Sequence, residues 1–236
     1  MSDIVLNVQR NLHMTILGNI DVTTREYAAH LLSERLLAYK DTDSHILAIP
    51  NGGVPIGFFL ANRLNLDFNV IPCRSIQLQG DMLMTLGAIS VEDISLREDL
   101  ELIPQSFIGG QLQVIRKKVE NEFNLYNAIK PATSLKGVTV ILVDDGLLDR
   151  HKIIACLRSI RKQKPGGIVV AIPFTTEQDA SSIAKEVDEF VFLYKDRYAQ
   201  RVYERLHVFP KITQEAVKVL LSNSLKHETL AVNEKI

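Results

Sequence analysis

Residues 138–146 read Val-Thr-Val-Ile-Leu-Val-Asp-Asp-Gly, an apolar and β-branched run that ends in two carboxylates and a glycine. A run without polar alternation is typical of a strand that is covered on both faces, as in a parallel sheet. Short apolar runs recur at 45–49, 68–71, 168–172 and 190–194, and helix-like patterns separate them. This alternation predicts an α/β fold with an open, mainly parallel sheet flanked by helices.

The helical patterns and turn signals set the expected organisation of the chain. Helices are expected at 54–64, 107–128, 150–163, 177–187 and 213–225, and a first helix is expected to start at Thr23, which has capping-box spacing to Glu26. No linker-like stretch divides the chain. We therefore expect one domain over 1–225, with 74–130 as a partly helical insertion, or hood, that includes a mobile segment, and a frayed tail over 226–236.

Composition excludes several classes of protein. The 236 residues carry 27 basic and 28 acidic side chains, a net charge of -1, which argues against a nucleic-acid or anionic-lipid binder. No apolar run reaches the roughly 20 residues of a membrane helix, and no signal segment is recognised at the N-terminus. We expect a cytoplasmic protein without membrane or nucleic-acid partners, in which Cys73 and Cys156 are buried, reduced thiols.

The first candidate site is the acidic pair that follows the strongest strand. Ligands of open parallel sheets bind where strands end and loops lead into helices. Asp144 and Asp145 repel each other unless a cation or sugar hydroxyls share them, so they could bind vicinal hydroxyls or hold Mg²⁺. The alternative is a solvated turn that bends at Gly146.

The second candidate site is a glycine loop between a buried strand and a helix. Residues 50–53 read Pro-Asn-Gly-Gly, and adjacent glycines let backbone N–H groups approach an anion. Asn51, Gly52 and Gly53 are therefore candidate ligand-binding residues. The alternative is a tight turn before the helix.

Together the two loops resemble a known family. Residues 140–146, Val-Ile-Leu-Val-Asp-Asp-Gly, are similar to the phosphoribosyl-pyrophosphate signature of type I phosphoribosyltransferases. Residues 46–57, Ile-Leu-Ala-Ile-Pro-Asn-Gly-Gly-Val-Pro-Ile-Gly, resemble their pyrophosphate loop, in particular that of a group of predicted phosphoribosyltransferases. The resemblance extends from about residue 21 to 221.

The resemblance implies a role for each loop. Asp144 and Asp145 would contact the ribose hydroxyls and Mg²⁺, and the loop from Gly146 would bind the 5′-phosphate with backbone amides at a helix N-terminus. Residues 51–53 would hold pyrophosphate with its Mg²⁺. A mobile segment within 75–91 would close over the site. The ligand would be phosphoribosyl pyrophosphate or another phosphorylated sugar or nucleotide, and a homo-oligomer is left open.

The phosphate loops depart from the family pattern. Where relatives have small residues and threonines, this chain has Asp149, Arg150, His151 and Lys152. The three cationic side chains could clamp an anion directly, or they could form a solvated first helical turn. His151, flanked by charged residues, is not expected to be a buried core histidine.

Two further subsites have changed. Asn51 stands where relatives usually have a cation, and Arg74 is the cation nearest the segment 75–81. Each change weakens the recognition of phosphate, while the surrounding strands and helices keep their patterns.

Three functions stay open on these residues. The first is Mg²⁺-dependent transfer of a phosphoribosyl group between pyrophosphate and a nucleobase-like acceptor. The second is a catalytically degenerate relative that senses a nucleotide or sugar phosphate, or that binds a partner protein. The third is hydrolysis or transfer on another phosphorylated sugar, with the same carboxylates in a different geometry.

Overall fold

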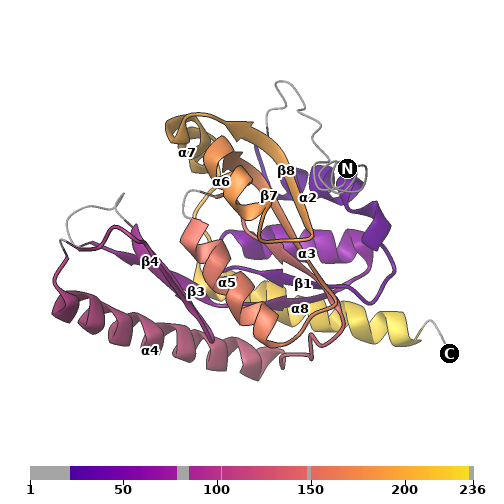
Figure 1. Ribbon diagram of the computed structural model, residues 1–236. Helices are drawn as coiled ribbons and strands as arrows, with labels where there is room; N and C mark the ends of the chain where they lie inside the picture. Colours follow the sequence, from indigo (N-terminus) through magenta and orange to yellow (C-terminus); the bar gives the residue numbers. More distant parts are fainter. Residues whose placement is uncertain (1–21, 79–84, 102, 148–149, 234–236) are drawn as a thin grey trace, which may run out of the picture.

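The computed structural model describes residues 22–78, 85–101, 103–147 and 150–233, with side chains through residue 224 (Figure 1). A five-stranded parallel sheet forms its centre, in the order β2-β1-β6-β7-β8. The strands are β1 (His45–Ala48), β2 (Asp67–Val70), β6 (Thr139–Val143), β7 (Gly167–Thr176) and β8 (Glu189–Asp196). The predicted α/β fold with a mainly parallel sheet is confirmed.

Helices cover both faces of this sheet. One face packs against α2 (Arg25–Arg35), α3 (Gly53–Leu64) and α8 (Gln214–Asn233), and the other packs against α5 (Arg150–Lys162) and α6 (Glu177–Ile183) (Figure 1). A short helix, α7 (Ala199–His207), follows β8, and a 3-10 turn at Leu37–Tyr39 precedes β1. No helix among the described residues has the length and apolarity of a membrane span.

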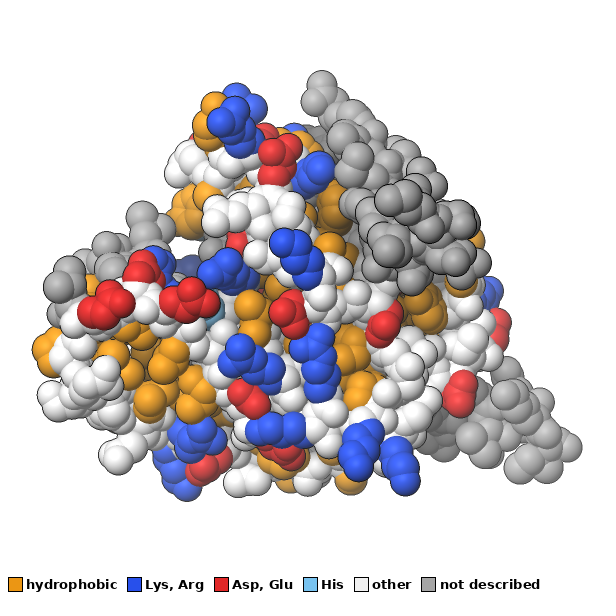
Figure 2. Space-filling model, viewed as in Figure 1, with side chains coloured by type: hydrophobic (Ala, Val, Ile, Leu, Met, Phe, Trp, Pro, Cys, Tyr) orange, Lys and Arg blue, Asp and Glu red, His pale blue; other side chains and the backbone are white. Residues whose placement is uncertain are grey.

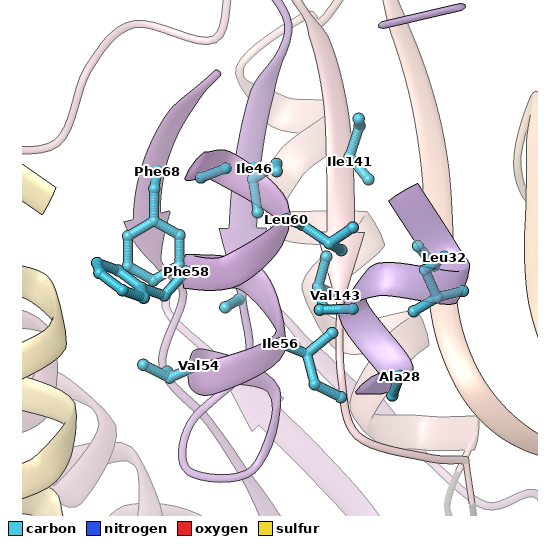
Figure 3. Packing of buried hydrophobic residues seen from close by; sticks show 14 of the residues in the cluster. Ala28, Leu32, Ile46, Val54, Ile56, Phe58, Leu60, Phe68, Ile141 and Val143 are labelled. Atoms are coloured by element: carbon cyan, nitrogen blue, oxygen red, sulfur yellow. The ribbon is translucent and has the colours of Figure 1, made fainter. Parts of the chain in front are cut away.

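The central strands are apolar on both sides because each side meets a helix layer. In β1, Ile46 and Ala48 pack toward α3, while Leu47 packs toward α5. Figure 3 shows Ile56 and Leu60 of α3 lying over the strands of this sheet. Burial on both faces explains the absence of polar alternation in the sequence of these strands.

The hood consists of an antiparallel sheet and a long helix. Its strands are β3 (Cys73–Gln77), β4 (Thr85–Ser90) and β5 (Ile94–Leu96), paired in that order, and α4 (Gln105–Ile129) packs against them. The range 75–91, within which a mobile segment is expected, contains most of two paired strands, and residues 79–84 between them lie outside the described residues. The hood has its own apolar cluster, separate from the two that cover the central sheet.

Several predicted boundaries need correction. The first helix is capped by Thr24 and not by Thr23, because the Thr24 hydroxyl accepts a hydrogen bond from the Tyr27 N–H at 3.1 Å. The sequence leaves the cap of α6 open between Thr175 and Thr176, and the structure assigns it to Thr176, whose hydroxyl accepts a hydrogen bond from the Asp179 N–H at 3.0 Å. Helix α7 was not predicted, and α8 continues beyond residue 225 to Asn233.

Charge is spread evenly over the face in view. In Figure 2, basic and acidic side chains are interspersed over α5, α6 and the hood instead of gathering by sign. This distribution agrees with the net charge of -1 and gives this face no extended surface for a polyanion.

Candidate functional site

The glycine loop (residues 50–53) and the acidic loop (residues 144–147) lie side by side at the carboxyl edge of the sheet. Their strands β1 and β6 are neighbours, and the Ile49 N–H donates to the Val143 carbonyl at 2.9 Å. A Cβ on Gly53 would lie 2.6 Å from that carbonyl oxygen and 2.8 Å from Cα of Asp144. Only glycine allows the two backbones to come this close.

Gly52 makes room for the second carboxylate. A Cβ at this position would lie 1.8 Å from Oδ2 of Asp145, so the carboxylate occupies the space that a side chain would need. The peptide bond between Pro50 and Asn51 is cis, and the Asn51 side chain is exposed. The sequence analysis places each loop at the end of a strand, and the structure brings the two loops together at one edge of the sheet.

Asp145 is held by an arginine that the sequence analysis did not identify. Arg25, the first residue of α2, donates from Nη2 and Nε to Oδ2 of Asp145 at 2.7 and 3.3 Å. Its Nη1 donates to the Pro210 carbonyl at 2.7 Å, and its guanidinium lies over the Phe209 ring, 4.7 Å from the centroid. Because it bonds both Asp145 and Pro210, Arg25 connects the acidic loop to the segment between α7 and α8. Its side chain is buried at this junction, with 9% of the residue exposed.

Asp144 is turned into the protein and paired with a lysine from the start of α5. It is 2% exposed, its Oδ2 accepts from Lys152 Nζ at 2.9 Å, and its Oδ1 accepts from the Asp145 N–H at 2.9 Å. Burial raises the pKa of Asp144 to about 6, although Lys152 opposes this shift. Burial alone would lower the pKa of Lys152, but the attraction of Asp144 outweighs it, so the lysine stays charged.

The three cationic residues at the start of α5 do not form a common anion clamp. Lys152 is engaged with Asp144, and His151 is buried, 8% exposed, with Nδ1 2.9 Å from the Ser95 hydroxyl of β5. The expectation for His151 is therefore wrong, because the hood packs over this turn of α5 and supplies a polar partner. Arg150 is partly exposed and donates to the Ser182 hydroxyl at 3.5 Å.

The rest of the acidic loop is filled with apolar side chains. Leu147 is buried, and its N–H donates to the Phe174 carbonyl at 2.8 Å. Through this bond Leu147 forms an isolated parallel β-bridge with Thr175, near the end of β7. Leu206 of α7 lies over Gly146, since a Cβ there would be 2.4 Å from Cδ2 of Leu206. The predicted site residue Asp149 lies outside the described residues.

Arg74 belongs to the hood. Its guanidinium donates to Oε1 of Glu122, a buried carboxylate of α4. Within the part of the chain that the structure describes, Arg74 therefore serves to fasten β3 to α4, and nothing brings it to the glycine loop.

The two cysteines are neighbours in space. The Cys73 thiol of β3 hydrogen-bonds with that of Cys156 of α5, and it also donates to the Lys152 carbonyl at 3.5 Å. Both thiols are buried and free, as expected. The hydrogen bond with Cys156, together with burial, raises the pKa of Cys73 well above its usual value.

The acidic pair as arranged does not fit a bound Mg²⁺. Each carboxylate already has a cationic partner, Lys152 for Asp144 and Arg25 for Asp145. A metal ion bound by both carboxylates would have to draw Asp144 out of its buried position and away from Lys152, and it would share Asp145 with Arg25. Across the described residues, no group of three or more His, Cys, Asp or Glu side chains is placed to hold a metal.

Comparison with known proteins supports the resemblance seen in the motifs. Over 170 residues, 70% of this chain, the sequence is 21% identical to the Mycobacterium tuberculosis protein named "Putative phosphoribosyl transferase Rv0571c" and to its counterpart MT0597 from another strain. The resemblance to phosphoribosyltransferases is confirmed. The phosphoribosyltransferase-like chain spans 38% of the length of these relatives. No family model matches it.

A solved structure shares the fold. The phosphoribosyltransferase-like chain superimposes on the protein TT1426 from Thermus thermophilus with a TM-score of 0.68. The match covers 86% of this chain and 99% of that one, at 23% sequence identity. The central sheet and the hood therefore form an arrangement that recurs in another protein.

Proposed function

We propose that this phosphoribosyltransferase-like chain is a catalytically degenerate relative that acts by binding, without transferring phosphoribosyl groups. One observation carries the proposal: both carboxylates of the acidic pair are neutralised by the chain's own cations, Arg25 and Lys152. Carboxylates that accept ribose hydroxyls or Mg²⁺ need free lone pairs that face the ligand. Here Asp144 faces the interior, and Oδ2 of Asp145 is occupied.

The phosphate subsites support the same conclusion. In this chain Asn51 brings no charge to the glycine loop, and two of the three cations at the start of α5 are engaged within the protein. Arg150 and Lys152 are both partly exposed, but Lys152 is paired with Asp144, so of these two Arg150 is the one whose charge is not bound to a carboxylate of the acidic pair. Transfer of a phosphoribosyl group through an oxocarbenium-like state depends on stabilisation of charge in the transition state. Without cationic contacts to the phosphate groups, the largest contribution to the rate acceleration is lost.

A second candidate function is Mg²⁺-dependent phosphoribosyl transfer from phosphoribosyl pyrophosphate to a nucleobase-like acceptor. It is favoured by the close packing of Gly52 and Gly53 on the acidic loop, which keeps the backbone of both loops together. Under this alternative, ligand binding displaces Arg25 and Lys152 from the carboxylates.

Calorimetry separates the two candidates. Wild-type protein is titrated with phosphoribosyl pyrophosphate and Mg²⁺ at millimolar concentration, and we expect no binding heat. Binding that is lost in Asp144→Asn and Asp145→Asn would show that the acidic pair still takes the donor, and release of pyrophosphate from that donor by wild-type protein in the presence of nucleobases would overturn the proposal in favour of the transferase candidate.

A variant in which residues 149–152 regain the small residues of the family pattern supplies the positive control. The triple variant Asp149→Thr, Arg150→Gly and Lys152→Thr returns the small residues that the resemblance implies, and it also removes the partner of Asp144. We expect this variant to gain binding of the Mg²⁺ complex, and the addition of Asp145→Asn to abolish it. If the variant folds and binds nothing, erosion of this loop is not the reason for the lack of activity.

A ligand of the degenerate protein is sought by thermal unfolding. Wild-type protein is heated with a panel of nucleotides and sugar phosphates. A ligand present at 100 times its dissociation constant stabilises the native state by about 2.7 kcal/mol, which gives a clear rise in Tm.

A further inference from the structure

A cavity of about 460 Å³ lies between the hood and the central sheet, apart from the glycine and acidic loops. Its lining comes from β1, β2, the turn after β4, α4, the segment 132–135 and α5. The C-terminal halves of α4 and α5 converge at this place (Figure 1). A volume of this size is in the range of pockets that bind small molecules, roughly 300 to 1,000 Å³.

The cavity exists because the helices leave part of the sheet uncovered. On this face the described helices α5 and α6 pack against a sheet of five strands. The strand β2 lies at the opposite edge of the sheet from β8, which α6 precedes, so these two helices do not reach it fully. Leu47, Ile71 and Leu135 form an apolar lining, and Phe123 of α4 adds an aromatic ring. An apolar lining with a few polar groups is the composition expected for a small-molecule site.

Asn69 supplies a hydrogen-bonding pair within this lining. It is buried, its Nδ2 donates to the Pro131 carbonyl at 3.2 Å, and its Oδ1 accepts from the Val70 N–H at 2.8 Å. An asparagine amide has two N–H donors and two acceptor lone pairs. Counting its bonds to the described residues, one donor and one lone pair of Asn69 remain for a ligand that presents a complementary acceptor and donor.

The charges around the cavity select against anions. Among the described residues, its lining contains no Lys or Arg, and Glu92 contributes a carboxylate. Lys162, a cation close to this lining, donates to the Glu92 carbonyl at 2.6 Å and pairs with Asp93 at 3.0 Å. Ser159, also in the lining, accepts from the Glu92 N–H at 3.2 Å. An anionic ligand would meet Glu92 without a compensating positive charge in the described lining.

We propose that this cavity binds an uncharged, flat ring compound that carries a hydrogen-bond donor next to an acceptor, such as an aromatic amide or lactam. The ring packs against Phe123 and the apolar lining, and its polar edge pairs with the Asn69 amide. The proposal does not depend on the proposed function, because the cavity shares no residue with the glycine and acidic loops.

Two isosteric probes test the charge and hydrogen-bond requirement. 2-Naphthamide and 2-naphthoate have the same ring and nearly the same size, but only the second is an anion at pH 7.5. Calorimetry on wild-type protein is expected to detect 2-naphthamide and to give at least a tenfold lower affinity for 2-naphthoate. Equal affinities, or no binding of 2-naphthamide at millimolar concentration, would overturn the proposal.

Substitutions locate the binding. Ala132→Trp places an indole in the cavity from an exposed position and is expected to abolish binding of 2-naphthamide. Ala128→Trp, at an exposed position of α4 outside the lining, is the matched control and is expected to bind normally. Glu92→Gln is expected to reduce the preference for the amide over the carboxylate. If Ala132→Trp instead converts a dimer into a monomer and leaves probe binding intact, the surface is a subunit interface and the proposal fails.

Discussion

The glycine loop after β1 and the acidic loop after β6 leave neighbouring strands at the same edge of the sheet, but they are held in different ways. The glycine loop is fixed by the backbone, since Gly53 lies so close to Val143 and Asp144 that a Cβ has no room. The acidic loop is fixed by side chains, with Lys152 on one carboxylate and Arg25 on the other. A protein can thus keep the shape of a ligand-binding edge while its charges are satisfied internally.

Loss of Lys152 is expected to have the largest effect on this arrangement. Lys152→Met leaves the buried Asp144 without a counter-charge, and breaking a buried pair in this way costs about 3 to 5 kcal/mol. Urea unfolding at pH 8 measures the loss. Lys118→Met, at an exposed position of α4, is the control and should change stability by less than about 0.5 kcal/mol.

The effect of Lys152→Met should also depend on pH. The folded pKa of Asp144, about 6, lies above its ordinary value of 3.8, so the stability contributed by its proton is present at low pH and lost as pH rises through 6. Without Lys152 this pKa rises further, because burial acts unopposed. The destabilisation should therefore be smaller at pH 5 than at pH 8, and a loss that is equal at both values would contradict a buried charge.

A Cβ on Gly53 is expected to have the next largest effect. Gly53→Ala puts a methyl group against backbone atoms of Val143 and Asp144, and β1 and β6 must shift to admit it, at about 3 kcal/mol. Gly109→Ala in α4, where no atom lies within 4 Å of the added Cβ, should instead stabilise the protein by about 0.5 to 1 kcal/mol. Similar effects at both positions would show that the loops are not held by close backbone packing.

Removal of Arg25 is expected to have a smaller effect, because Asp145 is 22% exposed and water replaces part of the lost contact. Arg25→Met should destabilise by about 2 kcal/mol, and Arg25→Lys by less, since a lysine keeps the charge but not the planar fork. Arg63→Met removes an exposed ion pair with Glu34 and a hydrogen bond to the Ser33 hydroxyl, and it should cost about 1 kcal/mol. Denaturant midpoints of the three variants rank these effects, and an Arg25→Met value no larger than that of Arg63→Met would contradict a fixed acidic loop.

Sequence reasoning could place the two loops together because parallel strands end at one edge and because apolar runs mark those strands. It could not find Arg25, whose partner Asp145 lies 120 residues away and whose own surroundings are an ordinary helix start. It misjudged His151 for a similar reason, since the partner Ser95 belongs to β5, a three-residue strand with little local pattern. Helix α7 was missed because it is only nine residues long and Val202 is its one buried position, although Val202, Tyr203 and Leu206 do fall at helical spacing.

The contact between Cys73 and Cys156 has a consequence for how the hood can be followed in solution. One thiol belongs to β3 and the other to α5, and both are shielded at the boundary between the hood and the central sheet. Alkylating reagents react with exposed thiolates, so burial protects both cysteines, and the raised pKa of Cys73 further lowers its reactivity. The rate at which these cysteines are alkylated therefore reports how often the hood separates from the central sheet. This measurement needs no engineered cysteine or attached label, because the reporting thiols are native residues.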